Sequence, residues 1–315
     1  MTVRTSNKIS NIPDISIIIV SYQTKKELAD CLDSIFREKN ISFEVIVVDN
    51  ASTDGTSKMI TQEFPKVKLI TLDSLIGFSE SNMRGVEKAC ANTLFFLNPD
   101  TLVRADAVHQ LFQTLWSQKN YGAISGRLLN ADGSLQPQGG SLPSLLVVCM
   151  WMFAIDDIPS IHELVSHYQE RRSSYFSSSD GKVKQFGWLG GTALMVKKEA
   201  FEQVGGWDPN IYMYGEDVEL CLRLDRAGWE IVLDPQAEIT HLRFKSTGSS
   251  QRSLVGEVEG IVYIWKKHFP VWQKPVLILL LLIGAWLRYV LFGILLRDEH
   301  KKQAYRKIFT VLANY

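Results

Sequence analysis

Asp100 is the residue whose type and position most directly suggest chemistry. It follows the apolar run 94–97, which predicts a buried strand, through the short pair Asn98-Pro99. Hard divalent cations bind carboxylate oxygens and take up the negative charge that develops on a leaving diphosphate. The alternative is a turn aspartate that starts the next helix. The position therefore makes Asp100 a candidate metal ligand.

A second acidic cluster, Glu216 and Asp217, follows Gly215 where a helical pattern begins. Acids favour helix N-termini through capping and the helix dipole, so a structural role is the alternative. However, Asp217 lies three and four residues before Leu220 and Cys221, so it shares the apolar face of its helix. A carboxylate on the buried face is a candidate general base.

Polar residues also follow the other predicted strands. These are the clusters Ser21-Tyr22-Gln23, Asp49-Asn50, and Gly77 with Asn82 and Gly85. Each cluster alone is an ordinary turn former. Ligands of a doubly wound sheet bind beyond the carboxyl ends of its strands, so the clusters are expected to converge with Asp100. His241 follows a strand-like stretch; a lone histidine is more often structural, but beside a cation a neutral imidazole suits a further ligand.

The elements that must position these residues alternate between strands and helices. Apolar runs predict strands at 15–20, 44–48, 67–71 and 94–97, and helical spacing predicts helices from Thr24 to Phe36, from Gly55 to Phe64, over 79–90 and over 105–117. Thr24 with Glu27 is a capping-box signature for the first helix. Strands joined by such helices indicate right-handed βαβ units in a doubly wound α/β sheet.

The alternation is lost from Asn130 to Gln185, and we interpret this segment as an insertion over one edge of the sheet. Recognisable strand and helix patterns resume after this segment. They predict a strand over 188–196, a short helix from Lys198, a helix over 217–227, and a strand over 230–233 that connects through Pro235 to His241. No internal repeat is visible.

The stretch from Pro275 to Leu296 has 22 residues and one charge, Arg288, which is long enough to span a bilayer. Both flanks are basic, and basic flanks prefer the cytoplasmic side, so a simple crossing is disfavoured. We predict a re-entrant or interfacial helix pair with a break near Gly284 or Arg288. The alternative is a buried C-terminal helix, but the apolar run 276–283 would cover every face of it.

The composition excludes some classes of partner and compartment. The 34 basic and 34 acidic residues cancel, so no nucleic-acid partner is expected. The four cysteines lie far apart without zinc spacing, which fits buried thiols in a reducing compartment. Residues 1–14 are polar, lack an apolar core and are predicted to be a flexible N-terminus, so a cytoplasmic catalytic part is expected.

Eight motifs in order closely resemble glycosyltransferase family 2, and within it the rhamnosyltransferase-like branch. They are V-S-Y-Q, V-V-D-N-A-S-T-D-G-T, G-F-S-E-S-N-M-R-G, F-L-N-P-D-T, W-L-G-G-T-A-L, G-G-W-D, M-Y-G-E-D-V-E-L-C-L-R-L and I-T-H, between residues 15 and 246. The resemblance implies a GT-A fold and an inverting single displacement. Residues 15–250 would form the glycosyltransferase domain (15–129 the nucleotide-binding half, 130–250 the acceptor half), and 251–315 a helical membrane-associating region.

The resemblance also implies roles for individual residues. The nucleotide would be bound by Ser21, Tyr22, Asp49, Asn82 and Arg84. A divalent metal, Mg²⁺ or Mn²⁺, would be bound by Asp100 and His241, although the first acid of the family's D-x-D motif is Asn98 here. Asp217 would be the catalytic base, and the acceptor side would comprise Trp207, Asp208 and Glu216. The family's H-x-x-G-x-S motif lacks its glycine here, so Arg243 and Lys245 are expected to contact the diphosphate.

The expected partners are a nucleotide-diphosphate sugar, a lipid-linked saccharide acceptor and the cytoplasmic face of a membrane, in cell-surface polysaccharide assembly. The resemblance alone suggests dTDP-L-rhamnose as donor, with galactofuranose, glucose or N-acetylhexosamine donors as alternatives. A sugar-1-phosphate nucleotidyltransferase would need a glycine-rich loop after the first strand, and residues 21–24 contain no glycine. A non-catalytic sugar-nucleotide scaffold is the other alternative, and the presence of both Asp100 and Asp217 speaks against it.

Overall fold

Runs of β-branched and aromatic residues form the centre of a mixed sheet in the computed structural model, which describes residues 12–156, 158, 165–170, 181–242 and 250–315. The sheet has the order β3-β2-β1-β4-β10-β6-β11-β5, with β8 paired to β11. Its strands are β1 (Ile15–Ser21), β2 (Phe43–Asp49), β3 (Lys68–Thr71), β4 (Thr93–Leu97), β5 (Thr101–Val103), β6 (Tyr121–Leu129), β8 (Lys184–Phe186), β10 (Ala193–Lys197) and β11 (Glu230–His241). A separate antiparallel pair joins β7 (Gly139–Gly140) to β9 (Trp188–Leu189).

The strand directions decide which residues share an edge. Strands β1, β2, β3 and β4 are parallel, β10 is antiparallel between β4 and β6, and β11 is parallel to β6. The carboxyl ends of β1, β2, β4 and β11 therefore lie at one edge, together with the amino end of β10. We call this edge the ligand edge, because loops at the carboxyl ends of such sheets bind ligands.

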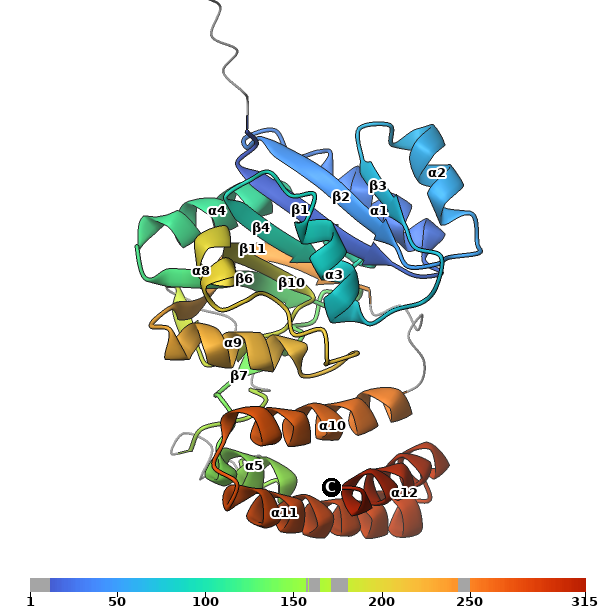
Figure 1. The fold of residues 1–315 in the computed structure, drawn as a ribbon, viewed down its shortest axis with the longest axis vertical. Coiled ribbons are helices and arrows are strands. Elements are labelled where there is room, and N and C mark those ends of the chain that lie inside the picture. Colours follow the sequence, from blue (N-terminus) through green and yellow to red (C-terminus); the bar gives the residue numbers. More distant parts are fainter. Residues whose placement is uncertain (1–11, 157, 159–164, 171–180, 243–249) are drawn as a thin grey trace, which may run out of the picture.

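Helices cover both faces of the sheet (Figure 1). One face packs on α1 (Lys25–Ile35), α2 (Thr56–Glu63) and α4 (Ala107–Ser117), and the other on α3 (Phe78–Val86), α8 (Lys198–Gln203) and α9 (Glu216–Arg226). Alternation along each strand explains the two cores, since Ile18 and Phe96 point to one face while Ile17 and Phe95 point to the other. This is the predicted α/β sheet with helices on both sides.

Several local predictions need correction. The predicted strand 188–196 is two strands, β9 and β10, which belong to different sheets. Strand β11 does not end before Pro235 but continues to His241, with a register shift between Asp234 and Glu238 that accommodates the proline. Thr24 does stand before α1, but its hydroxyl bonds Ser21 Oγ at 2.8 Å and does not cap the helix.

The C-terminal helices form a unit below the sheet (Figure 1). It comprises α10 (Ser250–His268), α11 (Gln273–Arg288), the π-helical segment Tyr289–Leu295 and α12 (Glu299–Ala313). Helix α5 (Leu145–Met152) lies beside α11, so this part of the predicted insertion joins the C-terminal unit and does not cover an edge of the sheet.

Arg288, the single charge of the apolar stretch, points into the C-terminal unit. Its guanidinium donates to the Trp151 carbonyl and lies 5.2 Å from the Trp151 ring. The helix is not broken at Gly284, where a Cβ atom would come within 2.6 Å of Met152. The glycine allows α11 to approach α5, and the change from α- to π-helix occurs at Arg288.

The other side of α11 and of the π-helical segment that continues it is exposed and apolar. Residues Gln273–Leu295 are long and apolar enough to cross a membrane by length and composition. Leu277, Leu281 and Ala285 are buried. The exposed residues, which we call the apolar face, are Val276, Leu279, Ile283, Trp286, Leu287, Leu291, Ile294, Leu295 and Leu296.

Candidate active site

The ends of β1 and β2 meet at the ligand edge. The Asn50 backbone N–H donates to the Ser21 carbonyl at 2.8 Å, which joins the two strand ends. Asp49 is buried and accepts hydrogen bonds from the Ser57 hydroxyl and, at 3.1 Å, from the Ser52 N–H. The structure thus brings Ser21 and Asp49 together, with Tyr22 partly exposed beside them.

Asn82 and Arg84 are not brought together. Asn82 is buried and donates to the Phe78 carbonyl of its own helix at 3.0 Å. Arg84 lies two residues on, which places it on the opposite side of α3, where it is exposed and paired with Glu80 and Glu87. Asn82 and Arg84 therefore point to different sides of α3, and contact of both with the donor stays a prediction.

Asp100 and His241 meet at the ligand edge. Pairing of β5 with β11 places Thr101 opposite His241, and the Leu242 N–H donates to the Asp100 carbonyl at 2.9 Å. The His241 Nε2 then lies 3.3 Å from Asp100 Oδ1, and both side chains are largely buried. A carboxylate oxygen and an imidazole nitrogen at this separation suit a shared divalent cation.

Gln136 is a residue of this site that sequence reasoning missed. Its amide nitrogen lies 2.9 Å from His241 Nδ1, and its oxygen is buried without a partner among the described residues. Rotation of the amide would place the oxygen against an Nδ1–H group. His241 would then carry its proton on Nδ1 and present a free Nε2 toward Asp100, which is how a metal-binding histidine is normally oriented. No local sequence signal marks Gln136.

Asp217 is held at the start of α9 by two backbone groups. Gly215 precedes the helix with a φ of 90°, a conformation that glycine adopts without strain. One Asp217 oxygen accepts from the Gly191 N–H at 3.1 Å and the other from the Val218 N–H at 2.8 Å. Burial raises the pKa of the Asp217 carboxyl, and the two backbone hydrogen bonds oppose this rise.

A short chain of contacts connects Asp217 to the Asp100 loop. Gly191, which binds Asp217, is followed by Thr192, and the Thr192 carbonyl accepts from the Asn98 N–H at 2.8 Å. Asn98 begins the Asn98-Pro99-Asp100 turn. The two acids therefore both belong to the ligand edge, one from each half of the chain.

Glu216 is an unusual neighbour of Asp217. Its side chain is buried, and within the described part of the chain its Oε2 has no hydrogen-bond partner. Burial and the negative charge of Asp217 raise the pKa of Glu216 to about 8. Glu216 therefore holds its proton at neutral pH and carries an O–H group that can donate a hydrogen bond.

Two of the predicted acceptor contacts have other roles. Trp207 is buried with its ring 5.0 Å from that of Phe96, and its Nε1–H has no hydrogen-bond partner among the described residues. Asp208 is buried and accepts from Tyr263 and Lys267 of α10, both at 2.7 Å. Its carboxylate is therefore engaged by the C-terminal unit, and its contact with an acceptor stays a prediction. Arg243 and Lys245 lie outside the described residues.

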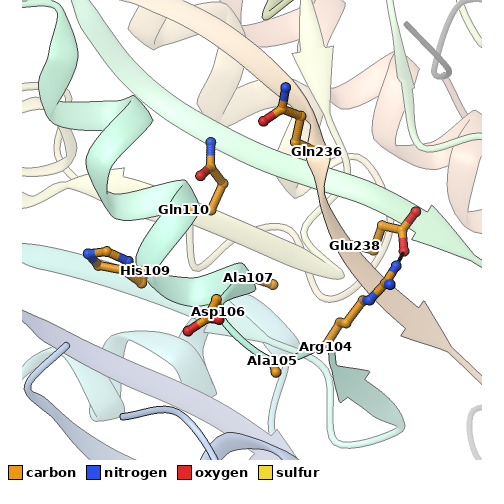
Figure 2. A pocket seen from close by; sticks show the side chains of 8 residues that line it. All are labelled: Arg104, Ala105, Asp106, Ala107, His109, Gln110, Gln236 and Glu238. Atoms are coloured by element: carbon orange, nitrogen blue, oxygen red, sulfur yellow. Dashed lines mark hydrogen bonds and ion pairs between the residues drawn. The ribbon is translucent and has the colours of Figure 1, made fainter. Parts of the chain in front are cut away.

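A pocket between the start of α4 and β11 lies apart from these groups. Figure 2 shows that its lining includes Arg104, which pairs with Glu238, together with His109 and Gln236. None of the predicted site residues lines it. The pocket is therefore separate from the predicted site residues.

Comparisons with known proteins identify the family and the fold of the chain. Residues 13–256 match the family described as "Glycosyltransferase like family 2". The N-acetylglucosaminyl-diphospho-decaprenol L-rhamnosyltransferase of Mycobacterium tuberculosis is 28% identical over 272 residues, which cover 82% of this chain and 86% of that protein.

Two solved glycosyltransferases share the fold. The mannosyltransferase of Pyrobaculum calidifontis, solved with GDP-Man and Mn²⁺, has a TM-score of 0.56 at 16% identity, covering 97% of this chain and 76% of its own. GalNAc-T7, solved with UDP, GalNAc and Mn²⁺, has a TM-score of 0.58 at 14% identity. The likeness covers 84% of this chain and 54% of that chain. These likenesses confirm the predicted GT-A fold. Because the family match extends over both halves of the sheet, from β1 to β11, the chain belongs to glycosyltransferase family 2.

Proposed function

We propose that the chain transfers L-rhamnose from dTDP-L-rhamnose to a lipid-linked saccharide, with inversion at the anomeric carbon, in cell-surface polysaccharide assembly. One observation carries the proposal: Asp100 with His241, and Asp217, belong to one edge of the sheet and are linked through Asn98 and Thr192. The choice of rhamnose and of a polyprenyl-diphosphate acceptor is supported by the name of the mycobacterial relative.

Asp100 and His241 would hold a divalent cation, Mg²⁺ or Mn²⁺. Their separation, and the Gln136 amide behind His241, fit such an ion. When bound, the cation supplies positive charge that stabilises the leaving diphosphate. No group of three or more His, Cys, Asp or Glu ligands occurs in the described ranges, so donor oxygens or water would complete the coordination. Both solved structures compared above contain Mn²⁺.

The residues of the chain itself would perform the remaining steps. Asp217 accepts the proton of the acceptor hydroxyl as that oxygen attacks, and the Gly191 N–H fixes the direction of the carboxylate. The raised pKa of Asp217 makes it a stronger base than an exposed aspartate. Ser21, Tyr22, Asp49 and Asn82 would bind the nucleotide. Arg243 and Lys245 would contact the diphosphate, and Glu216 the acceptor.

The apolar face of α11 would place the enzyme on the cytoplasmic surface of a membrane. Leu277, Leu281 and Ala285 pack inward and Arg288 binds α5, so one side of α11 is fixed to protein while the other is exposed. A helix with one apolar side and basic residues nearby lies in the interface and does not cross the bilayer. In this position the active site would meet a lipid-linked acceptor.

A transfer assay with a defined lipid acceptor tests the function. Detergent-solubilised protein is incubated with Mn²⁺, N-acetylglucosaminyl-diphospho-polyprenol and, separately, dTDP-rhamnose, UDP-galactofuranose, UDP-glucose or UDP-N-acetylglucosamine. We expect the lipid product to gain one deoxyhexose with the first donor only. Transfer from another donor would change the assigned sugar. Binding of a donor without transfer from any of them to any supplied acceptor would favour the scaffold alternative.

A further inference from the structure

Helix α10 supports the turn that precedes Asp217. Tyr214 and Gly215 both have positive φ, of 72° and 90°. A Cβ atom at Gly260 would lie 2.6 Å from the Tyr214 carbonyl oxygen, and one at Gly256 would lie 2.4 Å from the Tyr214 ring. Because these glycines lack side chains, the backbone of α10 directly contacts the strained turn that positions α9.

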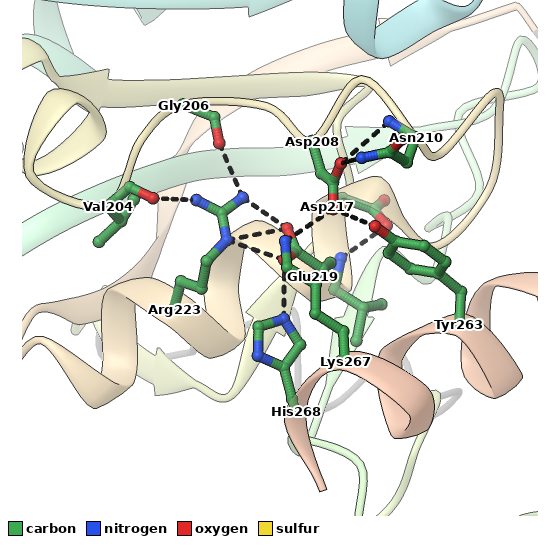
Figure 3. A network of polar contacts seen from close by, with 11 residues as sticks. Val204, Gly206, Asp208, Asn210, Asp217, Glu219, Arg223, Tyr263, Lys267 and His268 are labelled. Carbon is green, nitrogen blue, oxygen red and sulfur yellow. Dashed lines mark hydrogen bonds and ion pairs between the residues drawn. The ribbon is translucent and has the colours of Figure 1, made fainter.

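The same side of α10 continues to Lys267, which bridges two acids of the acceptor half. Figure 3 shows Lys267 between Asp208 and Glu219, with its Nζ 2.7 Å from Asp208 Oδ2 and 2.8 Å from Glu219 Oε1. Glu219 is fully buried, and the Asp208 side chain is 4% exposed, whereas that of Lys267 is 38% exposed. Tyr263, one turn earlier, also donates to Asp208 at 2.7 Å.

The partners of Asp208 and Glu219 lower the pKa of both acids. Arg223 and His268 also contact Glu219, and hydrogen bonds from Arg223 and Lys267 outweigh burial to lower its pKa. Lys267 and Tyr263 likewise hold the pKa of Asp208 well below its usual range despite burial. Both acids are therefore charged at neutral pH, and Lys267 is the cation that contacts both of them.

The bridge fixes the rotation of α9. Glu219 lies two residues after Asp217, so the two side chains point to opposite sides of the helix. Anchoring Glu219 on α10 therefore directs Asp217 toward Gly191 and the ligand edge. Rotation of α9 by even a small angle would move the Asp217 carboxylate away from the position set by that N–H group.

We propose that Lys267 is a positioning residue of the transfer reaction, which acts by holding Asp208 and Glu219 on α10 so that Asp217 keeps its place. The C-terminal unit is then a part of the catalytic apparatus as well as a membrane contact. This inference rests on the proposed role of Asp217 as the base.

The test compares Lys267→Met with Lys266→Met in detergent, where membrane binding does not limit the rate. Lys266 is the adjacent residue on α10, is exposed, and has no ion pair among the described residues. We expect Lys267→Met to lower kcat by tenfold to a hundredfold, because displacement of a catalytic group by about 1 Å has an effect of that size. The KM for the donor should stay within about twofold of wild type, since the nucleotide half is not touched, and Lys267→Arg should recover much of kcat. Lys266→Met should match wild type.

A second variant covers the case in which Lys267→Met does not fold. Gly260→Ala places a methyl group against the Tyr214 carbonyl and should lower kcat in the same way without removing a charge. Wild-type kcat in a folded Lys267→Met or Gly260→Ala variant would overturn the positioning role, as would a drop in thermal stability alone. Absence of transfer by the wild-type protein, or wild-type transfer by Asp217→Asn, would instead reject the proposed function on which the inference rests.

Discussion

The His241 imidazole lies 3.3 Å from the Asp100 carboxylate because two strands bring the residues together, not because the side chains are near in sequence. The backbone bond from Leu242 to the Asp100 carbonyl fixes the two chain segments. Gln136 then restrains the far side of the imidazole. A preorganised pair of this kind lowers the conformational entropy that metal binding would otherwise cost.

Removing either member of the pair should weaken metal activation. We expect Asp100→Asn and His241→Ala to raise the Mn²⁺ concentration needed for half-maximal transfer by at least about tenfold, and Gln136→Ala by about 10- to 100-fold, the range typical of groups that orient a ligand. His109→Ala is the matched control, because His109 lines the separate pocket. The measurement is transfer rate against Mn²⁺ concentration, and unchanged curves for all three variants would exclude a metal at this pair.

Replacing the base should abolish transfer without loss of the fold. Asp217→Asn keeps the shape of the side chain but removes its ability to take a proton, so we expect kcat to fall by about 10²- to 10⁴-fold. Asp225→Asn, at an exposed position on the same helix, should retain normal activity. The measurement is kcat with saturating donor, together with a thermal melt. More than a tenth of wild-type turnover in Asp217→Asn contradicts the assignment.

The central strands can be predicted from the sequence because burial on both faces makes them continuous apolar runs. Strand β6 escapes this signal, since its run is interrupted by Gly122 and Gly126. The structure explains both glycines: a Cβ atom would lie 2.6 Å from the Trp229 side chain at the first and 2.5 Å from the Ala237 carbonyl at the second. These two positions require glycine because neighbouring segments approach them closely. No local sequence pattern encodes that approach.

The candidate site likewise contains residues that the sequence predicts and residues whose surroundings it does not reveal. Asp100 and Asp217 are visible in the sequence because Asp100 follows an apolar strand pattern and Asp217 stands at the start of a helical one. The surroundings of Trp207 and Asp208 are not visible in the sequence, because a Trp-Asp pair after two glycines looks the same whether it contacts a ligand or the protein. The partners of Asp208 are Tyr263 and Lys267 of α10, which lie more than fifty residues away in sequence.

The buried Glu216 should make stability depend on pH. Its pKa is about 8 in the folded protein against an ordinary value of 4.5. Between these values the folded state keeps a proton that the unfolded state releases, so stability falls as pH rises from about 4.5 to about 8. Glu216→Gln lacks this effect. We expect its Tm to exceed that of wild type by at least about 2 °C more at pH 8 than at pH 5, which corresponds to about 1 kcal/mol. A constant difference across this range would contradict a protonated Glu216.

The raised pKa of Asp217 has a kinetic consequence. The base must be ionised to accept a proton, and burial raises its pKa above the ordinary aspartate value, so the acid limb of the kcat profile should lie above that value. Glu216→Gln removes a coupled acid next to Asp217 and should change the shape of this limb. Rate measurements from pH 4 to 9 test this, and an acid limb at the ordinary aspartate pKa would place the Asp217 carboxylate in contact with solvent.

The apolar face of α11 should control membrane binding independently of catalysis. Leu279, Ile283 and Leu291 are exposed, so aspartate at these positions leaves the packed side intact while adding charge that lipid does not accept. We expect the triple variant to lose most of its flotation with vesicles that contain anionic lipids, yet to keep wild-type kcat on a short-chain acceptor in detergent. The matched control is Leu279→Phe, Ile283→Leu and Leu291→Phe, which changes the same three positions but keeps them apolar and should still float. Flotation of the aspartate variant at the wild-type level would show that α11 is not the membrane contact, whatever the outcome of the transfer assay.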